Sequence, residues 1–399
     1  MKRKVVVTGM GVISSLGNNL NENHQSLRNA LSGIGKADFF ESAYVATLPF
    51  AEINASDEQL RIKVPNASNP SYTRTTLIAI HAVLEAIQDA QLTKEQVQSN
   101  RTAFISSSTV GGMCYTDSLY NDANDNGNPS PYVRSYEGSD HTVQIALYFG
   151  LTGYTDTINT ACSSSANAIM QGMRLIQTGR ADRVIVGGAD CLAKYTVNGF
   201  NALRILSESP CKPFDQNRDG LTLGEAAAYL VLEAEECSVG KRKWAEVSGA
   251  GNANDAHHPS ATSDDARGPV LAMTRALENA GLRPDQIAYI NAHGTGTENN
   301  DRTECVGFQR VFGTPPVFNS TKSYTGHTLG AAGSLEAVFT ILSIANQEVY
   351  ASLNCEHPQA EFAFQPVRSH IQVLPIAHAM SNSFGFGGNC TSLIFSACS

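Results

Sequence analysis

Short strand-like segments alternate with helical patterns along this chain, and that alternation constrains its fold more than any other feature. Brief runs rich in β-branched and apolar residues, bounded by Gly or Ser, are typical of strands buried on both faces. Such runs lie at 4–8, 102–106, 157–160, 183–186, 228–232, 244–248, 289–292 and 317–320. Helical periodicity marks 72–90, 164–177, 269–280 and 334–346. Strands that alternate with helices predict an α/β fold.

The two halves of the sequence repeat one local pattern. In the first half a strand leads into Thr160, Ala161 and Cys162 and then into a helix of small residues. In the second half a strand leads through Gly326 and His327 into another helix of the same kind. A charged segment around 235–243 separates the two patterns. With 399 residues the chain is long enough for two domains, and we expect duplicated halves at 1–238 and 239–399.

Composition excludes several classes of protein. Hydrophobic residues make up 42% of the chain and charged residues 16%, which excludes a disordered protein. No run approaches the ~18 apolar residues of a membrane span, and the net charge of −9 argues against nucleic-acid binding. The cysteines number nine and form no C-x-x-C pair, which argues against a disulfide framework. The N-terminal apolar run is too short for a secretory signal, so we expect a cytoplasmic protein.

Two motifs suggest ligands and are set aside. Gly9 and Gly11 follow the first strand, but Ser14 occupies the place of the third glycine of a dinucleotide loop. A tight turn is the better interpretation. The segment 255–259 contains His257 and His258 but no evident third ligand, so we expect no metal site.

A candidate nucleophile lies in the segment 159–167, where Cys162 is surrounded by small residues at a strand-to-helix junction. A helix N-terminus offers free N–H groups and a positive dipole end, both of which favour the thiolate. The alternative is an inert buried cysteine. The small neighbours leave room for a substrate, and we therefore interpret Cys162 as the nucleophile.

Three further segments place reactive residues beside glycine or small residues. The segment 291–297 delivers His293 into a Gly/Thr turn, and the segment 320–336 contains Lys322 and His327 before a small-residue helix. In the segment 382–389, glycines alternate with Phe384 and Phe386, and such backbone can direct N–H donors at an oxyanion. Taken singly, each segment has an ordinary alternative: His293 could be a core histidine, Lys322 a surface lysine, and the segment 382–389 a hairpin.

Taken together, these segments resemble those of an elongating β-ketoacyl-acyl-carrier-protein synthase of the thiolase superfamily. The similarity runs from 5–11 through 226–233 to 392–395, essentially the whole chain. The resemblance implies two duplicated α/β halves in a five-layered αβαβα sandwich. It also implies a homodimer, or a heterodimer with a ketosynthase-like chain-length subunit, and acyl carrier protein as the partner.

The resemblance assigns roles residue by residue. It implies a catalytic set of Cys162, His293, His327 and Lys322, with Glu336 as the carboxylate partner of the lysine. The backbone N–H groups of Cys162 and Phe386 would form the oxyanion hole. Thr295 and Thr297 would contact pantetheine, and Phe384 and Phe386 would line and gate the acyl channel. No cofactor is expected, because the carrier protein supplies the phosphopantetheine arm. The implied reaction is decarboxylative condensation of an acyl chain on Cys162 with malonyl-acyl carrier protein.

Alternatives within this resemblance remain open. A non-condensing chain-length subunit would lack the nucleophile, and an initiating synthase would have asparagine in place of His327. A CoA-dependent thiolase would use a second cysteine near the C-terminus, where Cys390 lies. Fatty acid and polyketide or polyene elongation fit equally well.

Two surface features bear on substrate and partner. Candidate cations for docking an acidic carrier protein are Arg61, Lys63, Arg74 and Arg134, although they form no dense cluster. The polar segment 121–140, together with His141, lies near the expected floor of the acyl pocket and suggests an unsaturated, keto-bearing or aryl-bearing chain. The alternative is a solvated loop beside the pocket.

Overall fold

The computed structural model describes residues 3–125 and 130–398, and within them ten strands form one hydrogen-bonded sheet. The strands follow the spatial order β3-β2-β4-β5-β1-β6-β10-β9-β7-β8. Their bounds are β1 Val5–Ser14, β2 Thr102–Ser107, β3 Thr155–Ile158, β4 Arg183–Asp190, β5 Ala226–Ala234, β6 Ala245–Asn254, β7 Tyr289–Asn291, β8 Val317–Asn319, β9 His378–Phe384 and β10 Asn389–Ser396.

The strand order contains an internal repeat. Read outward from the centre, the N-terminal half runs β1-β5-β4-β2-β3 and the C-terminal half runs β6-β10-β9-β7-β8, which is the same order shifted by five strands. The halves join where β1 pairs with β6, through Val6 opposite Glu246 and Val7 opposite Ala245. The connection between β5 and β6 contains the boundary expected between residues 238 and 239.

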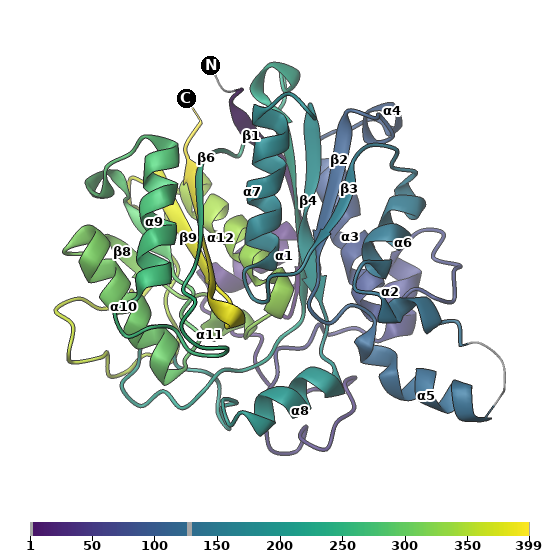
Figure 1. The fold of residues 1–399 in the computed structure, drawn as a ribbon, viewed down its shortest axis with the longest axis horizontal. Coiled ribbons are helices and arrows are strands. Elements are labelled where there is room, and N and C mark those ends of the chain that lie inside the picture. The colour runs from purple at the N-terminus through teal and green to yellow at the C-terminus, as the bar shows by residue number, and fades with distance from the viewer. Residues whose placement is uncertain (1–2, 126–129, 399) are drawn as a thin grey trace.

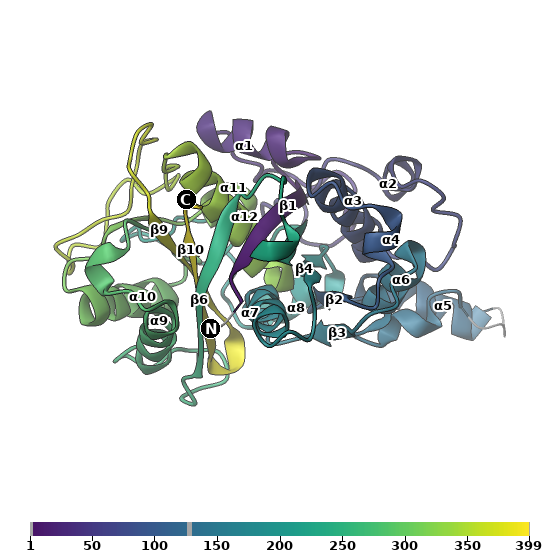
Figure 2. The same ribbon diagram turned by 90° about the horizontal axis from the view of Figure 1, so that it is seen from above.

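Helices complete five layers, which Figure 1 shows from one side to the other. Helix α3 (Arg74–Asp89) covers the outer face of β1 and β5, and α9 (Arg267–Ala280) covers β6 and β10. Between the two half-sheets, α7 (Ser164–Gln177) packs against α12 (Ala332–Asn346). Seen from above in Figure 2, the C-terminal strands lie on one side of this central pair and the N-terminal strands on the other. The αβαβα sandwich expected from the resemblance is confirmed.

Paired glycines explain how the outer helices approach the sheet so closely. A Cβ on Gly9 or Gly11 would lie 2.3 or 2.0 Å from a carbonyl oxygen of α3. On β6, a Cβ on Gly249 or Gly251 would lie 2.5 or 2.1 Å from a carbonyl oxygen of α9. Each half therefore uses a Gly-x-Gly pair inside a strand to pack its outer helix. The tight turn expected at Gly9 and Gly11 is wrong, because both glycines lie inside β1.

Every strand and helix range expected from the sequence overlaps an observed element. The remaining helices of more than four residues were not indicated by the sequence: α1 Leu20–Arg28, α2 Asp57–Lys63, α5 Thr116–Asp125, α6 Asp140–Phe149, α8 Lys194–Ala202 and α10 Glu298–Phe312. The segment Leu329–Asn346, which ends with α12, is long and apolar enough for a membrane span, but 89% of it is buried inside the protein, as expected of a core helix.

Candidate active site

The candidate nucleophile lies in a bend between β3 and α7. Ala161 adopts φ +55°, and Cys162 follows it two residues before the helix begins. The hydroxyl of Ser163 fixes the bend by donating to the Thr160 carbonyl and to Oδ1 of Asn389, both at 2.8 Å. The Cys162 side chain is consequently held at the base of a cavity and is 6% exposed.

The electrostatic environment of this thiol differs from the sequence expectation. Burial raises the pKa of Cys162 to about 11, although the Lys322 ammonium and the backbone N–H groups of Phe386 and Cys162 act in the opposite direction. The effect of desolvation on the pKa of Cys162 is therefore larger than the opposite effect of the helix N-terminus. The resting group is a neutral thiol, and its two neighbouring N–H donors remain available to an oxyanion.

His293 is positioned by two carboxylates of α10. The chain leaves β7 and turns at Gly294, where a Cβ would lie 2.6 Å from Ser320. Glu304 accepts hydrogen bonds from the amides of His293 and Gly294 at 2.9 and 2.8 Å. Asp301 accepts from the next two amides of the turn. No role was expected for Asp301 and Glu304 from the sequence, whereas the structure shows that they hold the turn.

Lys322 fixes the protonation state of His293. Its ammonium group donates to Nδ1 of His293 at 3.2 Å, to the carbonyl oxygen of the same residue at 2.6 Å, and to Oε1 of Glu336. Because Nδ1 accepts from a cation, the ring proton resides on Nε2. Burial raises the pKa of Glu336 to about 7, against the effect of Lys322.

His327 has the same tautomer as His293, but a backbone amide rather than a lysine fixes it. Its Nδ1 accepts a hydrogen bond from the Leu329 amide at 3.1 Å, so Nε2 carries the proton. Its own amide donates to the Thr222 carbonyl at 2.7 Å, which ties this turn to the N-terminal half. Burial and the nearby Lys322 cation hold the pKa of both His293 and His327 well below the usual 6.5. Both rings are therefore neutral donors at physiological pH.

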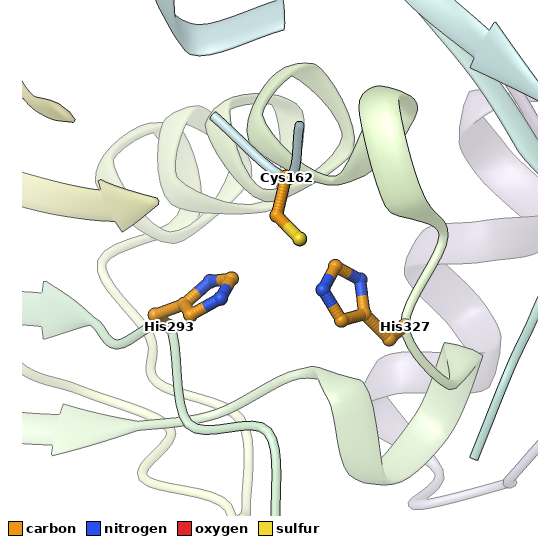
Figure 3. Close-up of side chains that lie close together, drawn as sticks. All are labelled: Cys162, His293 and His327. Carbon is orange, nitrogen blue, oxygen red and sulfur yellow. The ribbon is translucent and has the colours of Figure 1, made fainter. Parts of the chain in front are cut away.

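The three side chains converge on one point, as Figure 3 shows. Sγ of Cys162 and one ring nitrogen of each histidine lie within 4.8 Å of one another. The two imidazole rings stand nearly perpendicular, at 86°, with centroids 5.4 Å apart. A Cys-His-His set can also ligate a metal, but the Lys322 cation 3.2 Å from His293 Nδ1 opposes a second cation here.

A cavity of about 500 Å³ leads to this centre. Thr295 and Thr297 line its wall and share a hydrogen bond of 2.8 Å between their hydroxyls. Phe384 lies 5.9 Å from the His293 ring, and Phe386 stacks on Phe200 of α8 at 5.8 Å. The structure thus brings together every site residue indicated by the sequence, and adds Phe200, which no motif singled out.

Other candidates lie outside the cavity or are engaged elsewhere. Arg74 is buried and pairs with Glu225 and Asp57, so its interpretation as a docking cation is wrong. Arg61 donates to carbonyl oxygens of the chain at residues 69, 70 and 72. Cys390 lies outside the cavity lining and donates to the Gly388 carbonyl, which removes the feature that favoured a thiolase.

Asp255, His257, His258 and His141 also lie outside the cavity lining. Asp255 accepts from the amides of Ser263 and Gly268, while His257 and His258 are exposed. His141 is buried and its Nε2 lies 3.0 Å from the Ser106 hydroxyl, outside the cavity lining. Within the polar segment 121–140, residues 126–129 lie outside the described part of the chain.

Comparison with known proteins agrees with this geometry. The family model for the beta-ketoacyl synthase N-terminal domain matches residues 2–237, and that for the beta-ketoacyl synthase C-terminal domain matches residues 244–356. The chain therefore belongs to the beta-ketoacyl synthase family, as its motifs indicated.

Individual relatives cover nearly the whole chain. A 3-oxoacyl-[acyl-carrier-protein] synthase 2 of Staphylococcus aureus is 33% identical over 407 residues, covering 98% of each chain. The Vibrio cholerae protein of that name is 34% identical over 418 residues, covering 99% of each. Among solved structures, the ishigamide ketosynthase/chain length factor matches with a TM-score of 0.94 at 28% identity, over 100% of both chains. A chain of the solved complex between the ketosynthase ApeO and its chain length factor ApeC from Xenorhabdus doucetiae matches with a TM-score of 0.84 at 30% identity, over 99% of this chain and 98% of that one.

Proposed function

We propose that the protein condenses a carrier-bound acyl chain with malonyl-acyl carrier protein, releasing CO₂ and a β-ketoacyl-acyl carrier protein. The observation that carries this proposal is the convergence of the Cys162 sulfur with two neutral Nε2–H donors in one cavity. Relatives named 3-oxoacyl-[acyl-carrier-protein] synthase 2 support it. The phosphopantetheine arm arrives on the carrier protein, so the reaction requires no separate cofactor.

Acyl transfer is the first step. The sulfur of Cys162 attacks the thioester carbonyl of the acyl carrier, a new C–S bond forms, and the pantetheine sulfur leaves with the proton of the thiol. The backbone N–H groups of Cys162 and Phe386 hold the oxyanion that develops on the carbonyl oxygen. One such donor typically contributes on the order of 3 kcal/mol to lowering the barrier.

Decarboxylation and condensation follow in the same cavity. The Nε2–H groups of His293 and His327 donate to the thioester oxygen of malonyl carrier and stabilise the enolate left when CO₂ departs. The enolate carbon attacks the acyl group on Cys162 and expels the sulfur. Because the pKa of this thiol is raised to about 11, the freed thiolate takes up a proton and restores the resting enzyme.

Each side chain of the site takes one role in this reaction. Cys162 is the nucleophile, His293 and His327 are the enolate donors, and Lys322 with Glu336 organises the charge around them. Thr295 and Thr297 bind the pantetheine amides, while Phe384 and Phe386 line and gate the acyl passage.

We further propose a dimer, formed with an identical chain or with a chain-length subunit, in the cytoplasm. Strand β3 lies at an edge of the sheet and contacts α6, which carries the exposed Leu147. The complex of ApeO with its chain length factor ApeC contains a chain whose fold this protein shares. The cysteines in the described part of the chain are all free, which suits a reducing compartment.

Intact-protein mass spectrometry tests the function. The protein is incubated with acyl carriers of different lengths and saturation, beside a Cys162→Ser control. We expect one acyl adduct on the wild-type protein, mapped to Cys162, followed by CO₂ release when malonyl carrier is added. A protein that forms no adduct would instead be a non-condensing chain-length subunit.

A further inference from the structure

Asp190, the last residue of β4, is a buried carboxylate that the proposed reaction does not use. It is 0% exposed and forms none of the ion pairs found among the described residues. Hydrogen bonds alone compensate its charge, as a buried carboxylate requires. Oδ1 accepts from the Ser108 hydroxyl and the Val110 amide, and Oδ2 accepts from the Thr109 hydroxyl; the Thr109 amide contacts both oxygens.

One further hydrogen bond connects this carboxylate to the active site. The Gly330 amide donates to Oδ2 of Asp190 at 2.7 Å. Gly330 is the middle residue of the short helix η5 (Leu329–Ala331), which directly follows the turn of His327. Asp190 belongs to the N-terminal half and η5 to the C-terminal half, so this contact crosses between the two.

The residue between Gly330 and the histidine turn is strained. Leu329 adopts φ +51°, a conformation that branched side chains rarely occupy and that persists only where the surroundings enforce it. In this conformation the Leu329 amide donates to Nδ1 of His327. The strained backbone therefore determines which nitrogen of His327 carries the proton.

We propose that Asp190 is a positioning residue for His327, acting through the amides of Gly330 and Leu329. The carboxylate anchors η5 to the 108–110 turn, which holds Leu329 in its strained conformation and keeps the Nε2–H of His327 directed at the reaction centre. This inference rests on the proposed function, because the role of His327 there is to stabilise the enolate.

A positioning role predicts that loss of Asp190 slows decarboxylation much more than acyl transfer. Acyl transfer to Cys162 uses backbone donors that do not depend on η5, whereas decarboxylation uses the His327 ring. In an Asp190→Asn protein, the amide nitrogen faces two backbone N–H donors in either orientation, those of Thr109 and Val110 or those of Thr109 and Gly330, so the contact that ties η5 to the 108–110 turn loosens. We expect decarboxylation of malonyl carrier to fall about 100-fold, the usual scale for a displaced catalytic group, with acyl transfer changed by less than about threefold.

The matched control is Asp89→Asn. Asp89 is another carboxylate that accepts from a backbone amide, at Met10, and from the Trp244 indole, but it is only partly buried and lies on α3. This variant should leave both half-reactions within about threefold of wild type. Gly330→Ala supplies a second test, because its Cβ would lie 2.8 Å from Oδ2 of Asp190. It should reproduce the larger loss of decarboxylation even if Asp190→Asn does not fold.

A tautomer measurement completes the experiment. Nitrogen-15 NMR of the histidines should show the His327 proton on Nε2 in the wild type. In Asp190→Asn, the ring should exchange between the neutral tautomers with the proton on Nε2 and on Nδ1. Equal losses in both half-reactions, or an unchanged decarboxylation rate with an unchanged tautomer, would overturn the proposal. Wild-type protein that neither acylates Cys162 nor releases CO₂ would instead contradict the proposed function itself.

Discussion

The Lys322 ammonium donates to both Nδ1 and the carbonyl oxygen of His293, at 3.2 and 2.6 Å. One cation therefore fixes the ring orientation and the tautomer of the histidine together. All three of its N–H bonds have acceptors, since Glu336 takes the third. This arrangement supports the proposed role of Lys322 as an electrostatic organiser of the site rather than a general base.

Removing this cation should destabilise the fold in a pH-dependent way. Lys322→Met leaves Glu336 buried without its partner, which typically costs about 3–5 kcal/mol when the carboxylate is charged. Burial already raises the pKa of Glu336 to about 7, above its ordinary 4.5, and loss of Lys322 raises it further. The folded state then favours the protonated acid, so the loss of stability should be larger at pH 8 than at pH 5.

Chemical denaturation at the two pH values measures this effect. The double variant Lys322→Met, Glu336→Gln should recover much of the stability at pH 8, because no buried charge remains. A loss that is the same at both pH values would show that Glu336 does not carry the charge assigned to it.

Replacing a histidine donor should separate decarboxylation from acyl transfer. His327→Ala removes one of two donors to the enolate oxygen, and we expect CO₂ release to fall about 10²- to 10³-fold. Acylation of Cys162 should persist, since its oxyanion donors are backbone groups. His378→Ala is the control, because its ring lies outside the cavity lining and hydrogen-bonds to the Ser396 hydroxyl on the neighbouring strand β10. If His327→Ala abolished acylation to the same extent, the separate roles would be wrong.

The reactivity of the nucleophile should rise steeply with pH. The pKa of Cys162 is about 11, so the thiolate fraction grows about tenfold per pH unit below that value. Iodoacetamide labelling of Cys162, followed by peptide mass spectrometry, should therefore accelerate about tenfold from pH 7 to pH 8 and again to pH 9. A rate that levels off near pH 7 would show that the helix N-terminus outweighs burial after all.

Gly385 offers a test of the oxyanion hole. A Cβ there would lie 2.8 Å from the Thr160 carbonyl oxygen and 3.1 Å from the Cys162 amide. Gly385→Ala must therefore move the Phe386 N–H away from Cys162, and single-turnover acylation should slow by about 10²-fold. Gly199→Ala on α8, where a Cβ meets no neighbouring atom within 4 Å, is the control. Unchanged acylation in Gly385→Ala would exclude the Phe386 amide from the oxyanion hole.

The sequence predicted the alternation of strands and helices and the reactive residues because both leave local signals, whereas the five-layered arrangement was implied by the family resemblance. Buried strands are apolar, central helices show periodicity, and Cys162, His293 and His327 stand in glycine-rich or small-residue turns. Long-range contacts leave no such signal. The bond from Gly330 to Asp190 spans 140 positions, and the stack of Phe200 on Phe386 joins α8 to the glycine-rich segment after β9, two segments that no sequence pattern relates. The raised pKa of Cys162 also needed the structure, since burial is a property of the whole fold.

A pulse–chase experiment tests most directly whether Cys162, His293 and His327 form one catalytic centre. The protein is first labelled with a radioactive acyl group from its carrier and then mixed with unlabelled malonyl carrier protein. Our account predicts that the label leaves Cys162 and appears in β-ketoacyl carrier protein, with one CO₂ released per label transferred. Label that remains on Cys162 while CO₂ is released, or that leaves only by hydrolysis, would contradict it.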